Sequence, residues 1–118
     1  MLVLSRNRDE AIMIGDFIKI TVLMIDSDAQ RVLLRIKRPF NVRVRQKEYY
    51  KYDDVVEIGN DIRVVITDIQ RDQVKLGIDA PDEVAVHRWE IYKDIRRRLQ
   101  RRARKGVQVR VPSFAEVG

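Results

Sequence analysis

The chain of 118 residues is 45% hydrophobic and 36% charged, carries a net charge of +6 and contains no cysteine. This composition is typical of a folded protein with an ionic surface, and the lack of cysteine excludes a disulfide framework, a thiolate nucleophile and a thiolate metal site. No apolar segment approaches the roughly 20 residues that span a bilayer, and charge follows the N-terminus too closely for a secretory signal, so we expect a cytoplasmic protein without membrane contact.

The chain begins with a predicted strand and then repeats itself. "MLVLSR" alternates with a period of two, which places Leu2 and Leu4 on one face, and this strand has no clear counterpart later in the chain. Residues 12–50 align with residues 56–92 if the first copy holds two extra residues near Ser27. The matching pairs are Gly15 and Gly59, Ile36 and Ile78, Pro39 and Pro81, Val44 and Val86, and Tyr50 and Tyr92.

Each copy has the pattern of an antiparallel hairpin. "FIKITVLMI" and "QRVLLRI" in the first copy, and "DIRVVITDI" and "DQVKLGI" in the second, alternate and are rich in Val and Ile. Short polar joins separate the strands of each pair, and Pro39 and Pro81 end the second strands because proline cannot donate to a ladder. Short strands are predicted after them at "NVRV" and "EVAV".

From about residue 88 to residue 105 the period changes to that of a helix. Apolar residues recur every fourth position, at Ile91, Ile95, Leu99 and Ala103, and Gly106 is a plausible stop. The tail, residues 107–118, fits either an added edge strand or disorder.

Positive charge is concentrated at both ends of the chain. Residues 1–50 carry 10 basic and 6 acidic groups, residues 51–86 carry 4 and 9, and residues 87–118 carry 10 and 3. Six arginines between positions 96 and 104 have no acidic residue among them, which favours a bound polyanion over simple solvation of the helix. Nucleic acid is the first candidate and a membrane surface the second.

Catalytic chemistry has no support in the residues. His87 is the only histidine and has no partner nucleophile or carboxylate pair in a recognisable motif. The glycines form no phosphate-binding loop, and no acidic spacing resembles a metal site. We therefore predict no enzyme, no cofactor and no metal. Trp89 and the tyrosines at 49, 50 and 52 fit either base stacking or a core position.

Three signatures in order, "MLVLSR", "IMIGD" and "VKLGIDAPDEVAVHRWEIY", resemble the carbon storage regulator (CsrA/RsmA) family. The resemblance covers residues 1 to about 95 and contains two family members in tandem. Members of the family form intertwined homodimers, so the implied fold is mainly β: the intertwined antiparallel strands of a CsrA-like dimer, made from two tandem repeats in one chain, with a basic C-terminal α-helix. We expect a first repeat at residues 1–50, with a degenerate fifth strand and no long helix, and a second repeat at 51–106 with a degenerate first strand.

The family binds mRNA at GGA-containing motifs near ribosome-binding sites, in single strands or hairpin loops, through first-strand and fifth-strand residues of opposite protomers. The resemblance therefore implies an mRNA-binding post-transcriptional regulator, often a repressor. Its implied RNA-binding residues are Leu4, Ser5, Arg6, Ala80, Pro81, Val84, Val86, His87, Arg88 and Ile91. The basic helix adds secondary, non-specific contacts, for which we name Arg96, Arg97, Arg101 and Arg104.

A second RNA site is expected to be lost. Gln46 stands where Arg88 stands in the other copy, and the Gly15 to Gly59 offset places Glu48 and Tyr50 at the positions of Leu4 and Arg6. We expect that so short a segment cannot both end one repeat and form a full first strand of the next. One functional site per chain follows, in a monomeric pseudo-dimer, with a homodimer as the alternative.

A protein-interaction function is the competing hypothesis. In the family the C-terminal helix region can contact a protein antagonist, and a chain with one inactive site could modulate or pair with ordinary members. The retained residues Leu4, Arg6, Val86 and Arg88 argue against a purely protein-binding role.

Overall fold

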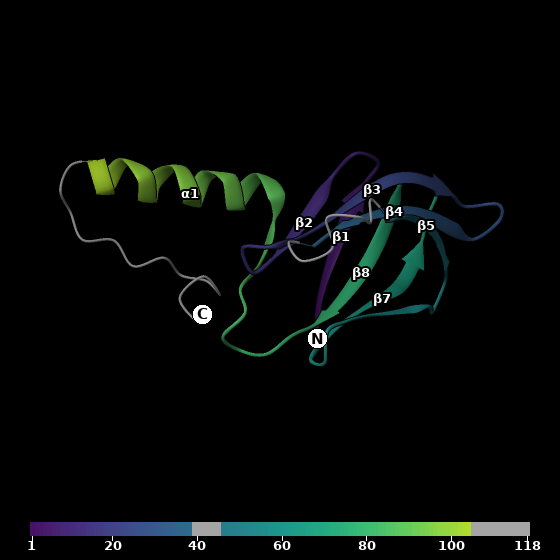
Figure 1. The fold of residues 1–118 in the computed structure, drawn as a ribbon. Coiled ribbons are helices and arrows are strands. Elements are labelled where there is room, and N and C mark those ends of the chain that lie inside the picture. Colours follow the sequence, from purple (N-terminus) through teal and green to yellow (C-terminus); the bar gives the residue numbers. More distant parts are fainter. Residues whose placement is uncertain (39–45, 105–118) are drawn as a thin grey trace.

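The computed structural model describes residues 1–38 and 46–104, which form two antiparallel sheets and one helix (Figure 1). The strand predicted at "NVRV", Gly106 and the tail lie outside the described residues. The elements in chain order are β1 (Leu2–Asn7), β2 (Ala11–Ile14), β3 (Ile18–Asp26), β4 (Arg31–Lys37), β5 (Gln46–Lys51), β6 (Val55–Ile58), β7 (Ile62–Ile69), β8 (Gln73–Asp79), β9 (Val86–Arg88) and α1 (Trp89–Arg104).

The two halves of the chain exchange strands. In the described residues, one sheet has the order β1-β8-β7-β6 and the other the order β5-β4-β3-β2-β9. The N-terminal strand β1 therefore completes the sheet built from β6, β7 and β8, while β9, which follows β8 in the chain, completes the sheet built from β2, β3, β4 and β5. This arrangement confirms the predicted intertwined, mainly β fold made from tandem repeats.

One hydrophobic core lies between the two sheets. Alternation sends Ile20, Val22 and Leu34 inward from the five-stranded sheet, where they are fully buried, and Val64 and Leu76 inward from the other. Aliphatic side chains from both sheets pack into a single cluster, so neither half buries its apolar face alone. The two repeats of the sequence therefore share one hydrophobic core.

The strand β5 corrects the prediction that the second repeat has no full first strand. Gln46–Lys51 pairs with β4 over six residues, as Leu2–Asn7 pairs with β8. The turns that follow also match: Asp9 and Asp53 have φ of 70° and 69°, and their N–H groups donate to Val22 O at 2.7 Å and Ile66 O at 2.8 Å. The boundary expected between residues 50 and 51 falls inside this strand.

The strand expected at "EVAV" begins later than predicted. Val86–Arg88 pairs with β2, whereas Val84 lies in the preceding loop and donates its N–H to Pro81 O at 2.9 Å. Helix α1 follows directly at Trp89 and projects away from the sheets (Figure 1), in agreement with the predicted helix. Among the described residues, no helix has the length and apolar character needed to cross a bilayer.

Replacing Gly59 with alanine should lower the free energy of unfolding by about 1 kcal/mol, because this residue has a φ of 67° that an L side chain adopts at a cost. Steric conflict adds little, since a Cβ here would meet only Asp61 Oδ1, at 4.0 Å. Urea denaturation measures the loss. Gly59→Asn is the control and should lose less, because asparagine tolerates the left-handed region. Equal losses in both variants would contradict this explanation.

Candidate nucleic-acid interface

The edges of the two sheets enclose a hollow at the end of β8. It has a volume of about 260 Å³ and is lined by Met1, Leu2, Ile78, Asp79, Ala80, Pro81, Asp82, Val84 and Val86. Among the described residues, β1 is the edge strand of one sheet and β9 the edge strand of the other, so each presents backbone groups that no described strand pairs with. An open hollow of this kind, which combines apolar side chains with the polar groups of Asp79 and Asp82 at a strand edge, can hold a flat ring and offer hydrogen bonds to its rim.

Four of the predicted RNA-binding residues lie together in this hollow. Ala80, Pro81, Val84 and Val86 are all half-buried and line its wall. They come from the second repeat, whereas Met1 and Leu2 in the same hollow come from the first strand. The structure thus joins the two distant segments that the sequence had paired.

First-strand residues lie deeper than the sequence suggested. Leu4 is 6% exposed, pairs with Leu76 and belongs to the core between the sheets. Ser5 is half-buried opposite Lys75. Leu2, which was not among the predicted RNA-binding residues, is 45% exposed and lines the hollow.

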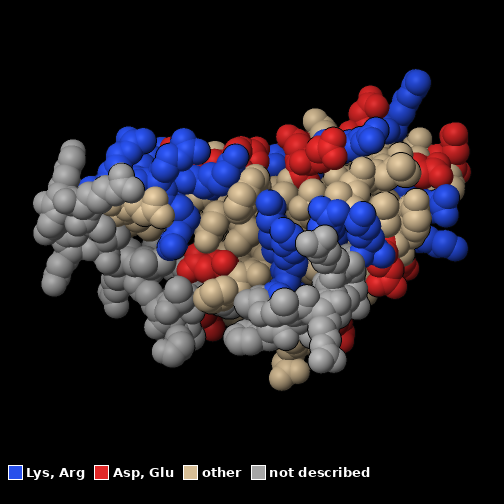
Figure 2. Space-filling view, turned by 45° about the horizontal axis from the view of Figure 1, so that its top comes forward, with Lys and Arg blue, Asp and Glu red and all other residues tan. Residues whose placement is uncertain are grey.

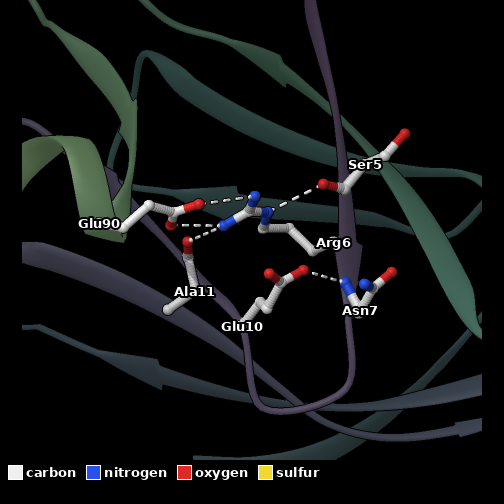
Figure 3. A network of polar contacts seen from close by, with 6 residues as sticks. All are labelled: Ser5, Arg6, Asn7, Glu10, Ala11 and Glu90. Atoms are coloured by element: carbon white, nitrogen blue, oxygen red, sulfur yellow. Dashed lines mark hydrogen bonds and ion pairs between the residues drawn. The ribbon is translucent and has the colours of Figure 1, made fainter.

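Arg6, one of the predicted RNA-binding residues, is buried and paired within the protein in this structure. Its side chain is 5% exposed and points toward the start of α1 (Figure 3). Nη1 and Nη2 donate to Glu90 Oε1 at 2.8 Å and Oε2 at 3.2 Å, Nη1 also donates to Ala11 O at 3.2 Å, and Nε donates to Ser5 O at 2.8 Å. The guanidinium therefore ties β1 to the helix of the other repeat.

The contact with Arg6 changes the pKa of Glu90. The hydrogen bond from Arg6 lowers the pKa of the Glu90 carboxyl, with a backbone hydrogen bond and the charges of Arg6 and Arg88 acting in the same direction. A second contact holds the same end of the helix, because Tyr92 Oη donates to Asp16 Oδ1 at 2.9 Å. Partial burial, followed by this bond, raises the pKa of the Tyr92 hydroxyl. Together these contacts fix the first helical turn beside β9.

The other predicted RNA-binding residues lie on β9 and along α1. His87 is half-buried opposite Met13, Arg88 is exposed opposite Ile12, and Ile91 is 50% exposed. Arg97 and Arg101 are exposed farther along α1, and Arg96 is half-buried beside His87 and Tyr92. Lysine and arginine side chains cover much of the helix surface (Figure 2). Arg104 ends the helix, but its side chain is outside the described residues.

The equivalent position in the other half of the molecule has different chemistry. Glu48 and Tyr50 on β5 face Leu34 and Val32, as Leu4 and Arg6 face Leu76 and Val74. Tyr50 Oη donates to Glu48 Oε2 at 3.1 Å, and burial followed by this bond raises the pKa of Tyr50 to about 12. A carboxylate and a neutral phenol replace a leucine and an arginine. The matching fifth-strand residues Val44 and Arg45 lie outside the described residues.

Comparison with known proteins agrees with this geometry. A profile of CsrA, described as a global regulator protein family, matches residues 1–53 and again residues 50–97. The chain belongs to the CsrA family. The two successive matches also confirm the tandem arrangement predicted from the sequence.

Three relatives in the CsrA family share the name translational regulator CsrA. The protein of Leptospira biflexa is 41% identical over 63 residues, which cover 53% of this chain and 77% of the relative. The Rhodopirellula baltica protein is 47% identical over 47 residues (40% and 67%), and the Bacillus subtilis protein is 45% identical over 53 residues (45% and 72%). No solved structure matches. The chain is thus a member of a family of translational regulators.

Proposed function

We propose that this CsrA-family chain is a cytoplasmic, sequence-specific mRNA-binding regulator with one GGA-reading site, which acts near ribosome-binding sites. The observation that carries the proposal is the shared hollow, in which the first-strand residue Leu2 and the fifth-strand residue Val86 come from different repeats. One chain thereby assembles the kind of composite surface that a dimer of single-repeat members builds from two. A monomer is therefore sufficient for binding.

The hollow suits a base from a single strand or a loop. Its apolar wall, made by Leu2, Val84 and Val86, can contact a base face, and the adjacent strand edges can pair with exposed base edges. Arg88 is exposed at the end of β9, where its planar fork can bind a guanine edge or a phosphate. Arg6 contributes indirectly, because it holds Glu90 and thus the helix start beside Arg88.

Chemistry, rather than a missing strand, supports one site per chain. β5 takes the place of a first strand, but it carries the exposed carboxylate of Glu48 where β1 has the buried, apolar Leu4. Tyr50 replaces the arginine that would hold a helix start in place.

Native mass spectrometry with a short hairpin RNA that displays GGA in its loop tests this function, because it reports oligomeric state and RNA count together. We expect one chain with one RNA, including when the RNA carries two such loops, since no second site supplies a linked contact. The same hairpin with the GGA changed to CCA is the matched control and should not bind tightly. Two RNAs on one chain, or a dimer carrying two, would contradict the single-site proposal.

Protein binding through the helix is the second candidate, favoured by one observation. Ile91 is 50% exposed, and Ile95 and Leu99 are only half-buried, so α1 keeps an apolar stripe that the sheets do not cover. A protein antagonist, or an ordinary family member, would bury this stripe. Under this alternative Arg88→Ala leaves partner binding unchanged, and the hairpin shows no binding at all.

A further inference from the structure

The outward face of the five-stranded sheet is strongly basic. Register pairs Lys19 with Lys37, Arg35 with Lys47 and Arg31 with Lys51 across β3, β4 and β5. These six side chains alternate with inward residues such as Ile20 and Leu34, so they share the face that turns away from the core. We call them the basic sheet face. Figure 2 shows a group of lysine and arginine side chains over the strands, apart from those along the helix.

Two aromatic rings lie among these cations. Lys19 Nζ is 3.9 Å from the centroid of the Trp89 ring and Lys93 Nζ is 5.7 Å from it, while Tyr92 stacks on Trp89 with centroids 5.7 Å apart. On the other side of the face, Arg31 Cζ lies 4.4 Å from the ring centroid of Tyr49, which is 45% exposed. Basic residues interleaved with aromatic rings are the usual composition of surfaces that bind single-stranded nucleic acid.

Little negative charge balances this face. Among the described residues, Arg31 is the one member of the six with a carboxylate within ion-pair distance, at 3.4 Å from Asp26. Partial burial, followed by the charges of Lys37, Lys93 and Arg35, lowers the pKa of the Lys19 ammonium. Nε of Arg35 is buried and has no hydrogen-bond partner among the described residues. Mutual repulsion of these groups would be relieved by a bound anion.

The other sheet supplies an internal comparison, because its pairs occupy equivalent positions. Where the basic sheet face has Lys19 with Lys37, the four-stranded sheet has Arg63 with Asp79. In place of Arg35 with Lys47 it has Gly77 with Val3, and in place of Arg31 with Lys51 it has Gln73 with Asn7. Neither of these two pairs contains a charged residue. A sheet of this kind therefore forms without cations at these positions, so folding alone does not account for the six basic residues of the five-stranded sheet.

We propose that the basic sheet face binds the phosphate backbone of the single-stranded RNA that flanks the specifically bound motif, with Trp89 and Tyr49 as stacking positions for its bases. The inference rests on the proposed function and extends it. Continuity supports it: β9 belongs to the same five-stranded sheet, and Trp89 directly follows Arg88. RNA leaving the hollow past Arg88 would reach Trp89 first and then Lys19.

Fluorescence anisotropy with two RNAs tests this path: a bare GGA-loop hairpin, and the same hairpin with about ten added uridines, a length within the usual range of single-strand sites. In the unmodified chain the flank should tighten binding by about tenfold. The double variant Lys37→Gln/Lys47→Gln changes two exposed residues, so it should fold normally. It should remove most of that gain and lower the salt slope by about 1, since each single-strand phosphate contact contributes roughly 0.7.

Arg63→Gln/Lys75→Gln is the matched control, because it removes the same charge from the four-stranded sheet. It should keep the gain from the flank. Equal affinities of the unmodified chain for both RNAs, or equal losses in the two double variants, would overturn the inference while leaving the proposed function intact if the bare hairpin still binds. If the hairpin does not bind, the proposed function fails. Binding of free oligouridine then tests the inference by itself: a loss of that binding in Lys37→Gln/Lys47→Gln would support it, and no binding would overturn it.

Discussion

Arg88→Ala should weaken binding of a GGA-loop hairpin by about 10- to 100-fold, because a guanidinium that pairs with a base edge contributes about 1–3 kcal/mol of discrimination. The side chain is exposed at the end of β9, close enough to Glu90 for its charge to lower the pKa of that carboxyl. The alanine variant removes the cation without touching the core. Fluorescence anisotropy at a fixed salt concentration measures the change.

Arg97→Ala is the control for charge, since Arg97 is exposed on α1 and lies away from the hollow. It should weaken binding by less than about threefold, and equally for GGA and CCA loops, as expected of a non-specific phosphate contact. If both variants lose the same affinity, or if the loss in Arg88→Ala is the same for both loops, Arg88 does not read sequence.

Glu90→Ala should lower the free energy of unfolding by about 1–2 kcal/mol, because it leaves the buried guanidinium of Arg6 without its counter-ion, while water can reach the position of the 52% exposed Glu90 side chain. Ala11 O and Ser5 O still accept hydrogen bonds from Arg6, but neither carries a charge. The start of α1 also loses its tie to β1. Urea denaturation followed by circular dichroism measures the loss.

Asp94→Ala is the matched control on the same helix, where the carboxylate pairs with Arg98 at the surface. It should cost no more than about 0.5 kcal/mol. A loss in Glu90→Ala as small as that in Asp94→Ala would show that the part-buried contact with Arg6 contributes no more to stability than a surface ion pair.

Acid provides an independent check of the Arg6–Glu90 contact. The folded-state pKa of Glu90 is lowered, so its contribution is present above its ordinary value of 4.5 and is lost as the pH falls through the folded-state value. The difference in stability between the unmodified chain and Glu90→Ala should therefore shrink below pH 4.5. A difference that stays constant into acid would contradict the assignment.

The sequence was sufficient for the strands that alternate clearly and for the helix, because both kinds of periodicity reflect burial of one face. The repeat also predicted the exchange of strands, through the family resemblance. β5 was missed because "QKEYYK" lacks the alternating aliphatic residues of β1. A signal was nevertheless present: Asp53 and Asp54 follow it at the same spacing as Asp9 and Glu10 follow β1, and these pairs form the matching turns.

The sequence predicted that β1 and β9 lie near one another, but not how deeply the side chains of β1 are buried. Alternation along β1 places Arg6 on the same face as Leu4, which already indicated an inward side chain. Its partner Glu90 lies 84 positions away, and pairing over such a distance depends on how the two sheets meet. The same holds for Lys19 and Trp89. Contacts between remote elements follow from tertiary packing, which local periodicity does not encode.

The exchange of strands also sets the order in which the chain can become structured during synthesis. β1 pairs with β8, and even its nearest partners, Asn7 and Gln73, are 66 positions apart. The three-stranded meander of β2, β3 and β4 can form early, because its segments are neighbours in the chain. β1 cannot pair with β8 until β8 has left the ribosome. Long-range pairing of this kind slows folding. Because both halves arrive on one polypeptide, however, the last step is a first-order closure, and its rate does not depend on how much of the protein the cell contains.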